Sequence, residues 1–240
     1  MTSLSIVIPM RNEAGNVAPL IAGIAEACAA LPDYEIIVVD DGSTDGTAAA
    51  VGALAATHPL RLIRHPTSGG QSAAVHSGVL AARGPVICTL DGDGQNPPAE
   101  LPKLYAPLLA DDTGSLGLVA GQRVGRQDTL SKRLGSRFAN WLRRRLLRDG
   151  TRDTGCGLKG FRRDAFLALP YFDHMHRYLP ALFKRDGWRV KLVDVAHAER
   201  HAGRSNYSNL QRAWVGLYDL IGVAWLIRRR KKVQAEEPGG

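Results

Sequence analysis

Short apolar runs and longer helical segments alternate through the first half of the chain. Segments 14–31, 45–57 and 70–82 have helical composition. Because strand-like runs alternate with helices of roughly 10–15 residues, the pattern predicts a mostly parallel sheet with helices on both faces. Ligands of such sheets bind beyond the carboxyl ends of the strands. The runs with the length and the Val, Ile and Leu content of buried strands are residues 4–9, 34–40, 60–65 and 85–90.

The second half shows a weaker pattern. It favours a long amphipathic helix in which a stripe of arginines runs beside the apolar face. Neither a repeat nor a Pro/Gly linker divides the chain, so we expect one α/β domain followed by a helix. The expected elements are strands at 118–121 and 188–195, the long helix at 129–148, a Gly-rich segment at 153–160 and a last helix at 209–230.

The 240 residues include 31 Lys and Arg against 23 Asp and Glu, which gives a net charge of +8. This excess indicates an anionic partner: nucleic acid, an acidic membrane surface or a phosphorylated substrate. Cys28, Cys88 and Cys156 are widely spaced and form no CxxC motif, so they support neither a disulfide framework nor a zinc site. They indicate buried thiols in a reducing compartment. Residues 1–5 lack a basic region and Pro9 interrupts the apolar run, so no signal peptide is expected.

Two adjacent carboxylates, Asp40 and Asp41, close the second predicted strand and lead into the turn-forming segment 42–46. Their mutual repulsion needs a cation or hydrogen-bond donors to offset it. Carboxylates at a strand end can also accept hydrogen bonds from a ribose or a base edge. The alternative is plain turn chemistry with a helix cap at Thr44 or Asp45, because Asp, Ser, Thr and Gly all favour turns.

Three oxygen-bearing side chains, Asp91, Asp93 and Gln95, alternate with glycines directly after the fourth predicted strand. Glycines permit a tight curl that brings the side chains to one point. Hard oxygen ligands suit Mg²⁺ or Mn²⁺, and Mg²⁺ usually completes its shell with substrate phosphates. A calcium-like loop or a plain turn is the alternative. An EF-hand is excluded, because no Glu stands at the twelfth position and no helix precedes the loop.

The last predicted helix contains an apolar run at 213–227, which at 15 residues is short for a membrane span of about 20 and includes Asp219. The basic segment 228–232 follows at once. An apolar, aromatic face beside a basic cluster is typical of a helix that lies in a membrane interface. Ordinary core packing is the alternative. The apolar face consists of Leu210, Trp214, Leu217, Tyr218, Ile221 and Trp225.

Four motifs follow one another in the first half: SIVIPMRNE at 5–13, IVVDDGSTDG at 37–46, GGQSAA at 69–74 and DGDGQNPP at 91–98. In this order and spacing they make the chain resemble glycosyltransferase family 2, whose fold is the nucleotide-sugar-binding GT-A fold. The second half resembles the branch with dolichol-phosphate mannosyltransferase and bacterial polyprenyl-phosphate glycosyltransferases. The segments that carry this second resemblance are Arg123, the Arg-rich helix, residues 153–162 and residues 200–207.

The resemblance implies roles for individual positions. The arginines of the second half independently favour phosphate binding there, because a guanidinium binds phosphate in a bidentate fork. The implied residues are Pro9, Asn12, Glu13, Asp40 and, in support, Asp41 for the nucleotide; Asp91, Asp93 and Gln95 for the metal; Asp91, Asp93 and Arg123 for catalysis; and Arg133, Asp153, Arg200, Arg204 and Ser205 for phosphate and acceptor binding.

The fold class that the resemblance implies is α/β, with a GT-A sheet and an additional amphipathic helix at the C-terminal end. His174 and His176 form an H-x-H pair that we expect to shape the acceptor site or to begin a helix. The expected organisation is a catalytic domain over 1–209, with a nucleotide-sugar half over 1–122 and an acceptor half over 123–209, then an interfacial helix over 210–232 and a disordered tail over 233–240.

The implied activity is the inverting transfer of a hexose from a donor of the GDP-mannose or UDP-glucose type to polyprenyl or dolichyl phosphate. Mg²⁺ or Mn²⁺ would be the cofactor, and the enzyme would lie on the cytoplasmic face of the membrane and serve cell-envelope biosynthesis. An acceptor phosphate is already an anion at pH 7, so the enzyme needs chiefly positioning and charge neutralisation.

Two alternatives remain open from the residues alone. The first is a family 2 transferase with a hydroxyl acceptor in cell-surface polysaccharide synthesis, for which Asp153 is the candidate base. The second, more remote, is a non-enzymatic protein that binds nucleic acid. The acidic pairs at 40–41 and 91–93 oppose it, because they would repel a phosphate backbone. We therefore expect no nucleic-acid partner.

Overall fold

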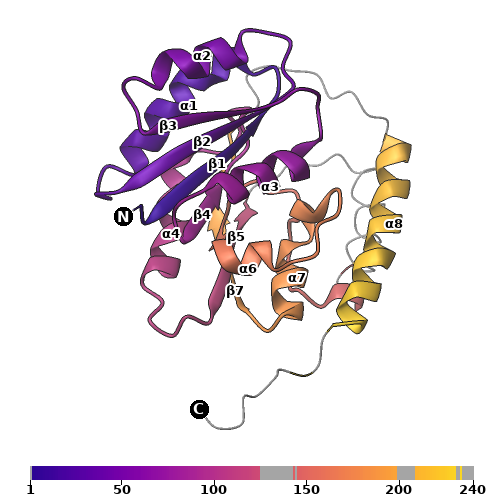
Figure 1. Ribbon diagram of the computed structural model, residues 1–240. Helices are drawn as coiled ribbons and strands as arrows, with labels where there is room; N and C mark the ends of the chain where they lie inside the picture. Colours follow the sequence, from indigo (N-terminus) through magenta and orange to yellow (C-terminus); the bar gives the residue numbers. More distant parts are fainter. Residues whose placement is uncertain (1, 125–142, 144, 199–208, 231–232, 234–240) are drawn as a thin grey trace.

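The computed structural model describes residues 2–124, 143, 145–198, 209–230 and 233, and for 209–215 it describes the backbone alone. Within these residues the chain forms one seven-stranded sheet in the order β3-β2-β1-β4-β6-β5-β7 (Figure 1). The strand pairs are parallel except for the two that involve β6. The prediction of a mostly parallel central sheet is therefore confirmed.

The strands of the first half stand where the apolar runs predict them, and β2 is buried from its second residue to its last. The helices between them are shorter than expected. The first ends at Ala27 rather than at 31. Pro32 disfavours helical backbone at Leu31, the last residue of the expected range. The elements are β1 (Leu4–Met10), α1 (Ala14–Ala27), β2 (Tyr34–Asp41), α2 (Thr47–Leu54), β3 (Leu60–His65), α3 (Gln71–Ala81) and β4 (Val86–Thr89).

The second half contains one strand that the sequence analysis missed. This strand, β6 (Lys159–Arg162), begins inside the segment interpreted as Gly-rich. Its four residues include no β-branched side chain, so they carry no strand signal. Gly160 is required there, because a Cβ would lie 2.8 Å from the carbonyl oxygen of Leu104. The other elements are η1 (Pro98–Glu100), α4 (Leu101–Leu109), β5 (Leu116–Arg123), α6 (Arg163–Leu167), η2 (Met175–Arg177), α7 (Leu179–Arg185), β7 (Arg189–Val195) and α8 (Asn209–Arg228).

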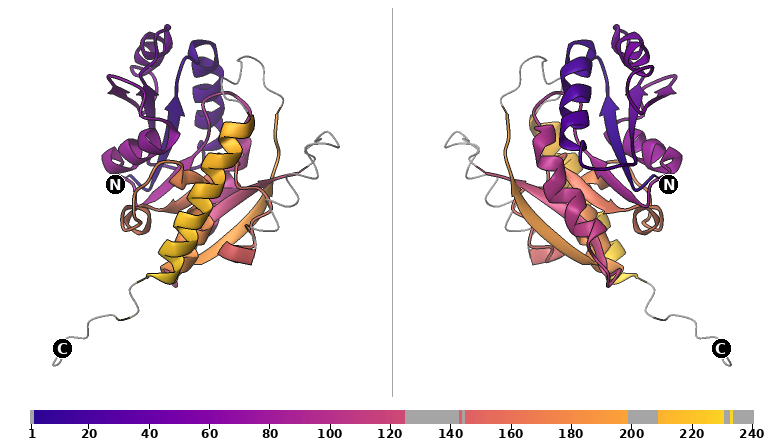
Figure 2. Two further views of the ribbon diagram at one scale, coloured as in Figure 1. Left: turned by 90° about the vertical axis from the view of Figure 1, so that its right-hand side faces the viewer. Right: turned by 90° about the vertical axis from the view of Figure 1, so that its left-hand side faces the viewer.

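Two apolar cores cover the two faces of the sheet. Side chains of α1, α2 and α4 form the first, and those of α3, α6, α7 and α8 form the second. Figure 2 shows α8 running along one side of the molecule, over the second half of the sheet. The expected helix at 129–148 lies mostly outside the described residues. Of the helices that are described, none is both long and apolar enough to cross a bilayer.

Candidate active site

A cavity of about 760 Å³ opens at the carboxyl ends of β1, β2 and β4. This is where a sheet of this topology is expected to bind its ligand. Glu13, Asp41, Asp91 and Asp93 all line it, so the acidic residues that follow these strands converge on one space. A second cavity of about 580 Å³ lies at the amino ends of β5 and β7 and is lined by none of the predicted site residues.

Asn12 holds the loop that follows β2. Its backbone is left-handed, with φ of 56°. Its N–H donates to Ser43 Oγ at 2.9 Å, and its Oδ1 accepts from the N–H of Thr44 at 2.9 Å. Asn12 therefore has a structural task that the resemblance did not imply. Pro9 lines the cavity, and the nucleoside contact implied for both residues stays a prediction.

Asp40 is fully buried at the end of β2. Its Oδ1 accepts from the N–H of Ser43 at 2.9 Å. Its Oδ2 finds no hydrogen-bond donor among the described residues, although Arg64 Nε lies 3.4 Å away. An unsatisfied buried acceptor costs about 1–3 kcal/mol or more. Asp40 itself is not part of the cavity lining, and the nucleotide contact implied for it stays a prediction.

Asp41 is surrounded by donors, which offset its charge. Ser68 Oγ donates at 2.6 Å, the N–H groups of Gly69 and Gly70 donate at 2.8 and 2.9 Å, and His65 Nδ1 lies 2.7 Å away. Burial raises the pKa of Asp41, but these hydrogen bonds outweigh it, so the net shift of its pKa is downward. Asp41 thus organises the loop that leads into α3.

The turn chemistry weighed as an alternative also occurs, at Asp45. Its Oδ1 accepts from the N–H of Thr47 at 2.9 Å. The N-cap of α2 is nevertheless Gly46, so the predicted cap at Thr44 or Asp45 is wrong by at least one residue. Thr47 Oγ1 also accepts from the N–H of Glu13 at 2.9 Å, which joins the start of α2 to the N-cap of α1.

Asp91 follows β4 with both carboxylate oxygens engaged. Gln71 Nε2 donates to Oδ1 at 2.6 Å, and Asn96 Nδ2 donates to Oδ2 at 3.0 Å. The carboxylate lies directly against Gly157, where a Cβ would come within 2.3 Å of it. Burial, followed by the charge of Asp93, raises the pKa of Asp91, and neighbouring cations offset this only in part. A cation at this point would relieve that repulsion.

Asp93 stands two residues further along the same loop. Its Oδ1 accepts from the N–H of Gln95 at 3.1 Å, and the carbonyl of Gln95 accepts from the N–H of Ala198 at 3.0 Å. Gly94 supplies the left-handed backbone of the curl, with φ of 75°. No cluster of three or more His, Cys, Asp or Glu that could hold a metal occurs in the described part of the chain. The loop offers the two carboxylates, and the metal role of the Gln95 side chain stays a prediction.

Arg123, predicted to be catalytic, and Asp153, predicted to bind phosphate or acceptor, pair with each other. Arg123 ends β5, and its Nη2 donates to Asp153 Oδ1 at 2.9 Å while its Nε donates to Oδ2. This hydrogen bonding raises the pKa of Arg123 although burial opposes it. The guanidinium is thus held in a two-point fork. The phosphate and acceptor contacts implied for the two residues stay predictions.

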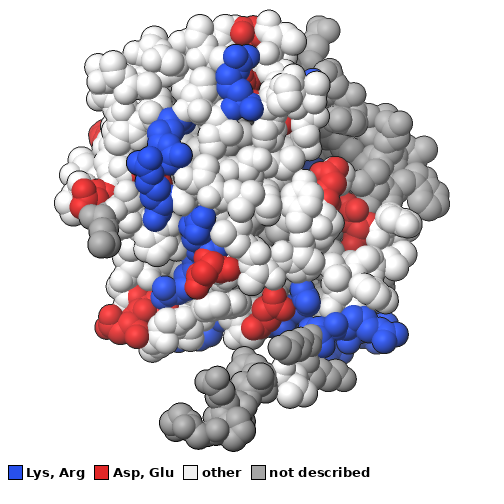
Figure 3. Space-filling model, viewed as in Figure 1, with Lys and Arg blue, Asp and Glu red and all other residues white. Residues whose placement is uncertain are grey.

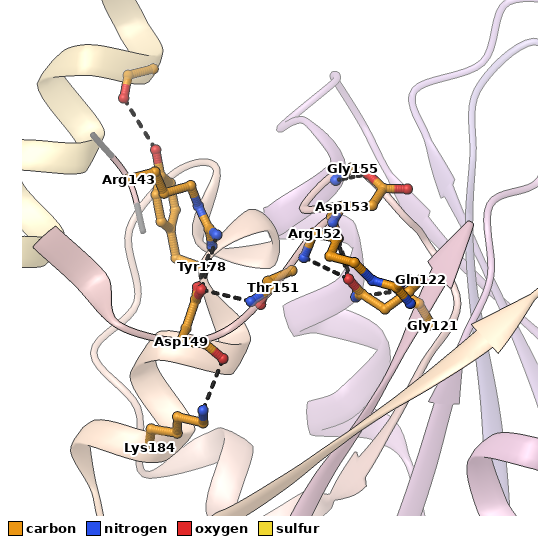
Figure 4. A network of polar contacts seen from close by, with 11 residues as sticks. Gly121, Gln122, Arg143, Asp149, Thr151, Arg152, Asp153, Gly155, Tyr178 and Lys184 are labelled. Carbon is orange, nitrogen blue, oxygen red and sulfur yellow. Dashed lines mark hydrogen bonds and ion pairs between the residues drawn. The ribbon is translucent and has the colours of Figure 1, made fainter. Parts of the chain in front are cut away.

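Gln122, which the sequence analysis did not single out, holds Asp153 in this position. Its side chain is buried, and its Oε1 accepts the N–H groups of Arg152 and Asp153 at 2.8 and 3.0 Å (Figure 4). Its Nε2 donates to the carbonyl of Gly121 at 2.9 Å. The side-chain amide thereby binds the backbone of residues 152–153 to the end of β5. Glutamine is mostly exposed in folded proteins, so its residue type gave no signal.

We expect Gln122→Met to destabilise the protein by about 1–3 kcal/mol, because two backbone N–H groups lose their acceptor. The measurement is urea unfolding of this variant beside Gln122→Ala. Methionine has a similar volume, so it removes the hydrogen bonds without a large cavity. Wild-type stability in the Met variant, with loss in the Ala variant alone, would show that Gln122 contributes packing only.

A buried ion pair holds the chain that leads to Asp153. Arg143 Nη1 and Nη2 donate to the two carboxylate oxygens of Asp149 at 3.1 and 2.5 Å (Figure 4). Lys184 Nζ of α7 donates to the carbonyl of Asp149 at 2.8 Å, and Tyr178 OH donates to the carbonyl of Gly216 in α8 at 3.2 Å. These contacts join α7 and α8 to the segment beside the cavity.

Besides the strand ends, the cavity is lined by Asp173, His174, His176 and Arg177, and we call the segment 173–177 that contains them the 173–177 wall. His176 Nδ1 lies 2.7 Å from Ser72 Oγ, and burial lowers the pKa of His176 well below its ordinary value. His174 has a left-handed backbone with φ of 62°, and its Nδ1 lies 3.2 Å from Asp219 Oδ2 of α8. The H-x-H pair therefore shapes the cavity, and Asp219 is a neighbour that sequence spacing could not reveal.

Four of the predicted phosphate-binding residues fall on parts of the chain that the structure does not describe. Their contacts with phosphate therefore remain predictions. They are Arg133, Arg200, Arg204 and Ser205.

Several solved sugar transferases have a similar fold. Mannosyl-3-phosphoglycerate synthase from Rubrobacter xylanophilus gives a TM-score of 0.71 at 20% identity, covering 99% of this chain and 78% of that one. Glucosyl-3-phosphoglycerate synthase from Mycobacterium tuberculosis, with Mg²⁺ and UDP, gives 0.69 at 20% identity, covering 94% and 79%. A mannosyltransferase from Pyrobaculum calidifontis, with GDP-Man and Mn²⁺, gives 0.65 at 23% identity, covering 95% and 65%. The predicted GT-A fold is confirmed.

Two curated relatives are more similar in sequence. Dodecaprenyl-phosphate galacturonate synthase of Rhizobium johnstonii is 33% identical over 235 residues, which cover 95% of this chain and 68% of that protein. Undecaprenyl-phosphate 4-deoxy-4-formamido-L-arabinose transferase of Yersinia enterocolitica is 35% identical over 222 residues, which cover 91% and 66%. The chain thus spans about two thirds of the length of these relatives.

The family comparison covers the strands and loops that form the cavity. A family model described as Glycosyl transferase family 2 matches residues 5–169, well over half of the chain. The matched residues include Glu13, Asp41, Asp91 and Asp93, whose convergence on the cavity is described above. The resemblance noted in the sequence motifs is confirmed: this chain belongs to glycosyl transferase family 2.

Proposed function

We propose that this protein transfers a hexose from a nucleotide sugar to a polyprenyl phosphate, with inversion at the anomeric carbon. The observation that carries the proposal is the convergence of Glu13, Asp41, Asp91 and Asp93 on one cavity at the carboxyl ends of β1, β2 and β4. Relatives that cover most of this chain are named as transferases acting on dodecaprenyl or undecaprenyl phosphate. The acidic lining of the cavity disfavours the nucleic-acid alternative.

The donor would lie across the strand ends, with its base at Asp40 and its diphosphate at the Asp91–Asp93 loop. The unsatisfied Oδ2 of Asp40 would accept an N–H of the base. Two repelling carboxylates with hard oxygen atoms fit Mg²⁺ or Mn²⁺, so Asp91 and Asp93 would hold the cation. That cation would neutralise charge on the departing nucleoside diphosphate. Solved structures of similar fold contain Mg²⁺ with UDP and Mn²⁺ with GDP-Man.

A phosphate acceptor fits the described residues better than a hydroxyl acceptor. An alcohol needs a base to remove its proton, and Asp153 is the candidate that the sequence analysis named. Its carboxylate is committed to the two-point ion pair with Arg123. The phosphate of a lipid acceptor is already ionised at pH 7, so positioning and charge neutralisation suffice.

The protein would reach a lipid acceptor from the membrane surface through α8. Leu220 and Val223 of this helix are buried in the second core, whereas Tyr218, Ile221 and Trp225 are 83, 59 and 59% exposed. With Leu217, these exposed residues form what we term the α8 stripe. The stripe is followed by the exposed Arg228, Arg229 and Arg230, and Figure 3 shows basic side chains at that end of α8. Basic residues near an anionic surface each contribute about 1 kcal/mol.

We further propose the cytoplasmic face of the membrane as the location. The three cysteines are all buried and unpaired. Free thiols persist in a reducing compartment, which supports an enzyme that works on the cytoplasmic side.

The membrane proposal predicts the behaviour of the double variant Ile221→Ser/Trp225→Ser. It should reduce sedimentation with vesicles of phosphatidylglycerol and phosphatidylcholine by about tenfold or more, because each buried apolar side chain contributes about 1.5–3 kcal/mol. The matched control is Leu80→Ser, which removes an exposed leucine of α3. Point variants are sharper than removal of α8, since that helix also contributes to the core. Equal sedimentation of all three proteins at low salt would contradict the proposal.

The proposed reaction is tested with a panel of radioactive nucleotide sugars and undecaprenyl phosphate. We expect one donor class to deliver sugar into the butanol-extractable lipid when Mg²⁺ or Mn²⁺ is present, and none to do so in EDTA. A panel that spans GDP- and UDP-sugars and yields no labelled lipid would contradict the proposal, as would equal transfer in EDTA.

A further inference from the structure

We infer that Arg177 binds the phosphate group of the lipid acceptor. Arg177 lies on the 173–177 wall and lines the same cavity as Asp91 and Asp93. The inference rests on the proposed function, because it assigns a described residue to the acceptor side of that site.

The cavity is rich in carboxylates, so an anionic acceptor needs a cation in order to enter. Arg123 is already neutralised by Asp153. Among the described residues, Arg11 and Arg177 are the arginines that line the cavity, and Arg177 forms no ion pair with a described carboxylate. Arg11 directly follows β1, within the motif assigned to the nucleotide. Arg177 is therefore the available guanidinium on the 173–177 wall, and its fork matches phosphate.

The backbone beneath Arg177 is held on both sides. His176 contacts Ser72 Oγ through Nδ1 at 2.7 Å, and Tyr178 is buried with its hydroxyl on the carbonyl of Gly216. The N–H of Arg177 itself donates to the carbonyl of His174 at 3.0 Å. The Arg177 side chain is exposed while its chain neighbours are fixed. A binding group on a rigid support loses little entropy when its ligand arrives.

The 173–177 wall also touches α8 near the α8 stripe. His174 Nδ1 lies 3.2 Å from Asp219 Oδ2, and Figure 1 shows α8 beside the segment that joins α6 to α7. The same turn of α8 presents Leu217 and Tyr218 to solvent. A phosphate bound at Arg177 therefore has an apolar surface next to it for the attached chain. A soluble phosphate would make no use of that surface, so the geometry favours a lipid phosphate.

The test compares wild-type protein with Arg177→Ala, Arg177→Lys and the control Arg83→Ala, an exposed arginine that does not line the cavity. We expect Arg177→Ala to raise the KM for undecaprenyl phosphate at least tenfold while the Kd for the donor's nucleoside diphosphate with Mn²⁺ stays within twofold. Lysine should restore part of the loss, since it keeps the charge but not the fork. Unchanged acceptor KM would overturn the inference, and so would an equal loss in nucleotide affinity, which would place Arg177 on the donor diphosphate.

Direct binding separates failure of this inference from failure of the proposed function. Binding of detergent-solubilised undecaprenyl phosphate and of undecaprenol is measured by native mass spectrometry for each protein. We expect wild-type protein to retain the phosphate form, and Arg177→Ala to retain it at least tenfold less. If wild-type protein binds undecaprenyl phosphate and Arg177→Ala binds it equally well, only the inference fails. If wild-type protein does not bind undecaprenyl phosphate in preference to undecaprenol, the proposed acceptor is wrong and the inference fails with it.

Discussion

An Asp93→Ala variant should fold normally and lose about two to three orders of magnitude in kcat. Asp93 lies on the loop after β4 and lines the cavity beside Asp91. Removal of one of the two carboxylates should weaken the hold on the divalent cation and on the donor diphosphate together. Loss of a single preorganised electrostatic contact typically costs about 10²–10³ in rate. The measurement is sugar transfer to lipid at saturating Mg²⁺ or Mn²⁺, beside thermal unfolding.

Asp112→Ala is the matched control, because Asp112 is an exposed carboxylate that does not line the cavity. It should retain wild-type turnover. Wild-type activity of Asp93→Ala after EDTA treatment and return of the metal would mean that the loop does not hold the cation.

A single methyl group at position 157 should reduce activity, because it would displace the Asp91 carboxylate. The Cβ of Gly157→Ala would lie 2.3–2.5 Å from the carboxylate atoms of Asp91, closer than real contacts allow. Asp91 would have to leave its position between Gln71 and Asn96. We expect about a hundredfold loss in kcat/KM, equivalent to about 2.7 kcal/mol of transition-state stabilisation. The measurement is steady-state transfer together with donor affinity.

The control for this variant is Gly52→Ala, since a Cβ at Gly52 in α2 meets nothing within 4 Å. A double-mutant cycle tests the cause. In an Asp91→Ala background, Gly157→Ala should add little further loss, because the carboxylate that it displaces is already gone. Full additivity of the two losses would show that Gly157 acts by another route.

The acidic half of the site could be predicted from the sequence because each carboxylate directly follows a strongly apolar strand. Asp40 and Asp91 lie at the ends of runs so rich in Val, Ile and Leu that these runs could be identified as buried strands. Because parallel strands end at one edge of the sheet, the two carboxylates could be expected at the same edge. The position of Gly157 against Asp91 could not be predicted. That contact joins residues 66 positions apart and depends on β6, whose four residues carry no strand pattern.

The C-terminal helix shows a different limit of sequence interpretation. Membrane contact and core packing were weighed as alternatives, yet α8 has a face suited to each. Leu220 and Val223 point into the second core, whereas Tyr218 and Trp225 are exposed. Asp219, which sequence analysis treated as an obstacle to spanning, contacts His174. An apolar helix contains no local signal for which of its faces the rest of the fold will cover.

Pairing between predicted functional residues also lay beyond the sequence. Arg123 was assigned to catalysis and Asp153 to phosphate and acceptor binding, and in the fold they bind each other. The assignment followed motif positions one at a time, whereas an ion pair depends on how β5 and the segment after Asp149 come together. The amide of Gln122 holds these two segments together. Its role could be recognised only from the positions of β5 and of the backbone at residues 152–153.

The most direct test of the account offers the enzyme two acceptors with the same chain, undecaprenyl phosphate and undecaprenol. The donor is the nucleotide sugar selected from the panel, Mg²⁺ or Mn²⁺ is present, and the sugar–lipid product is quantified by mass spectrometry. We predict a glycosyl phosphate lipid from the first acceptor and no product from the second, because a phosphate needs no base whereas Asp153, the candidate base for an alcohol, is paired with Arg123. Transfer to undecaprenol at an equal or greater rate would contradict it.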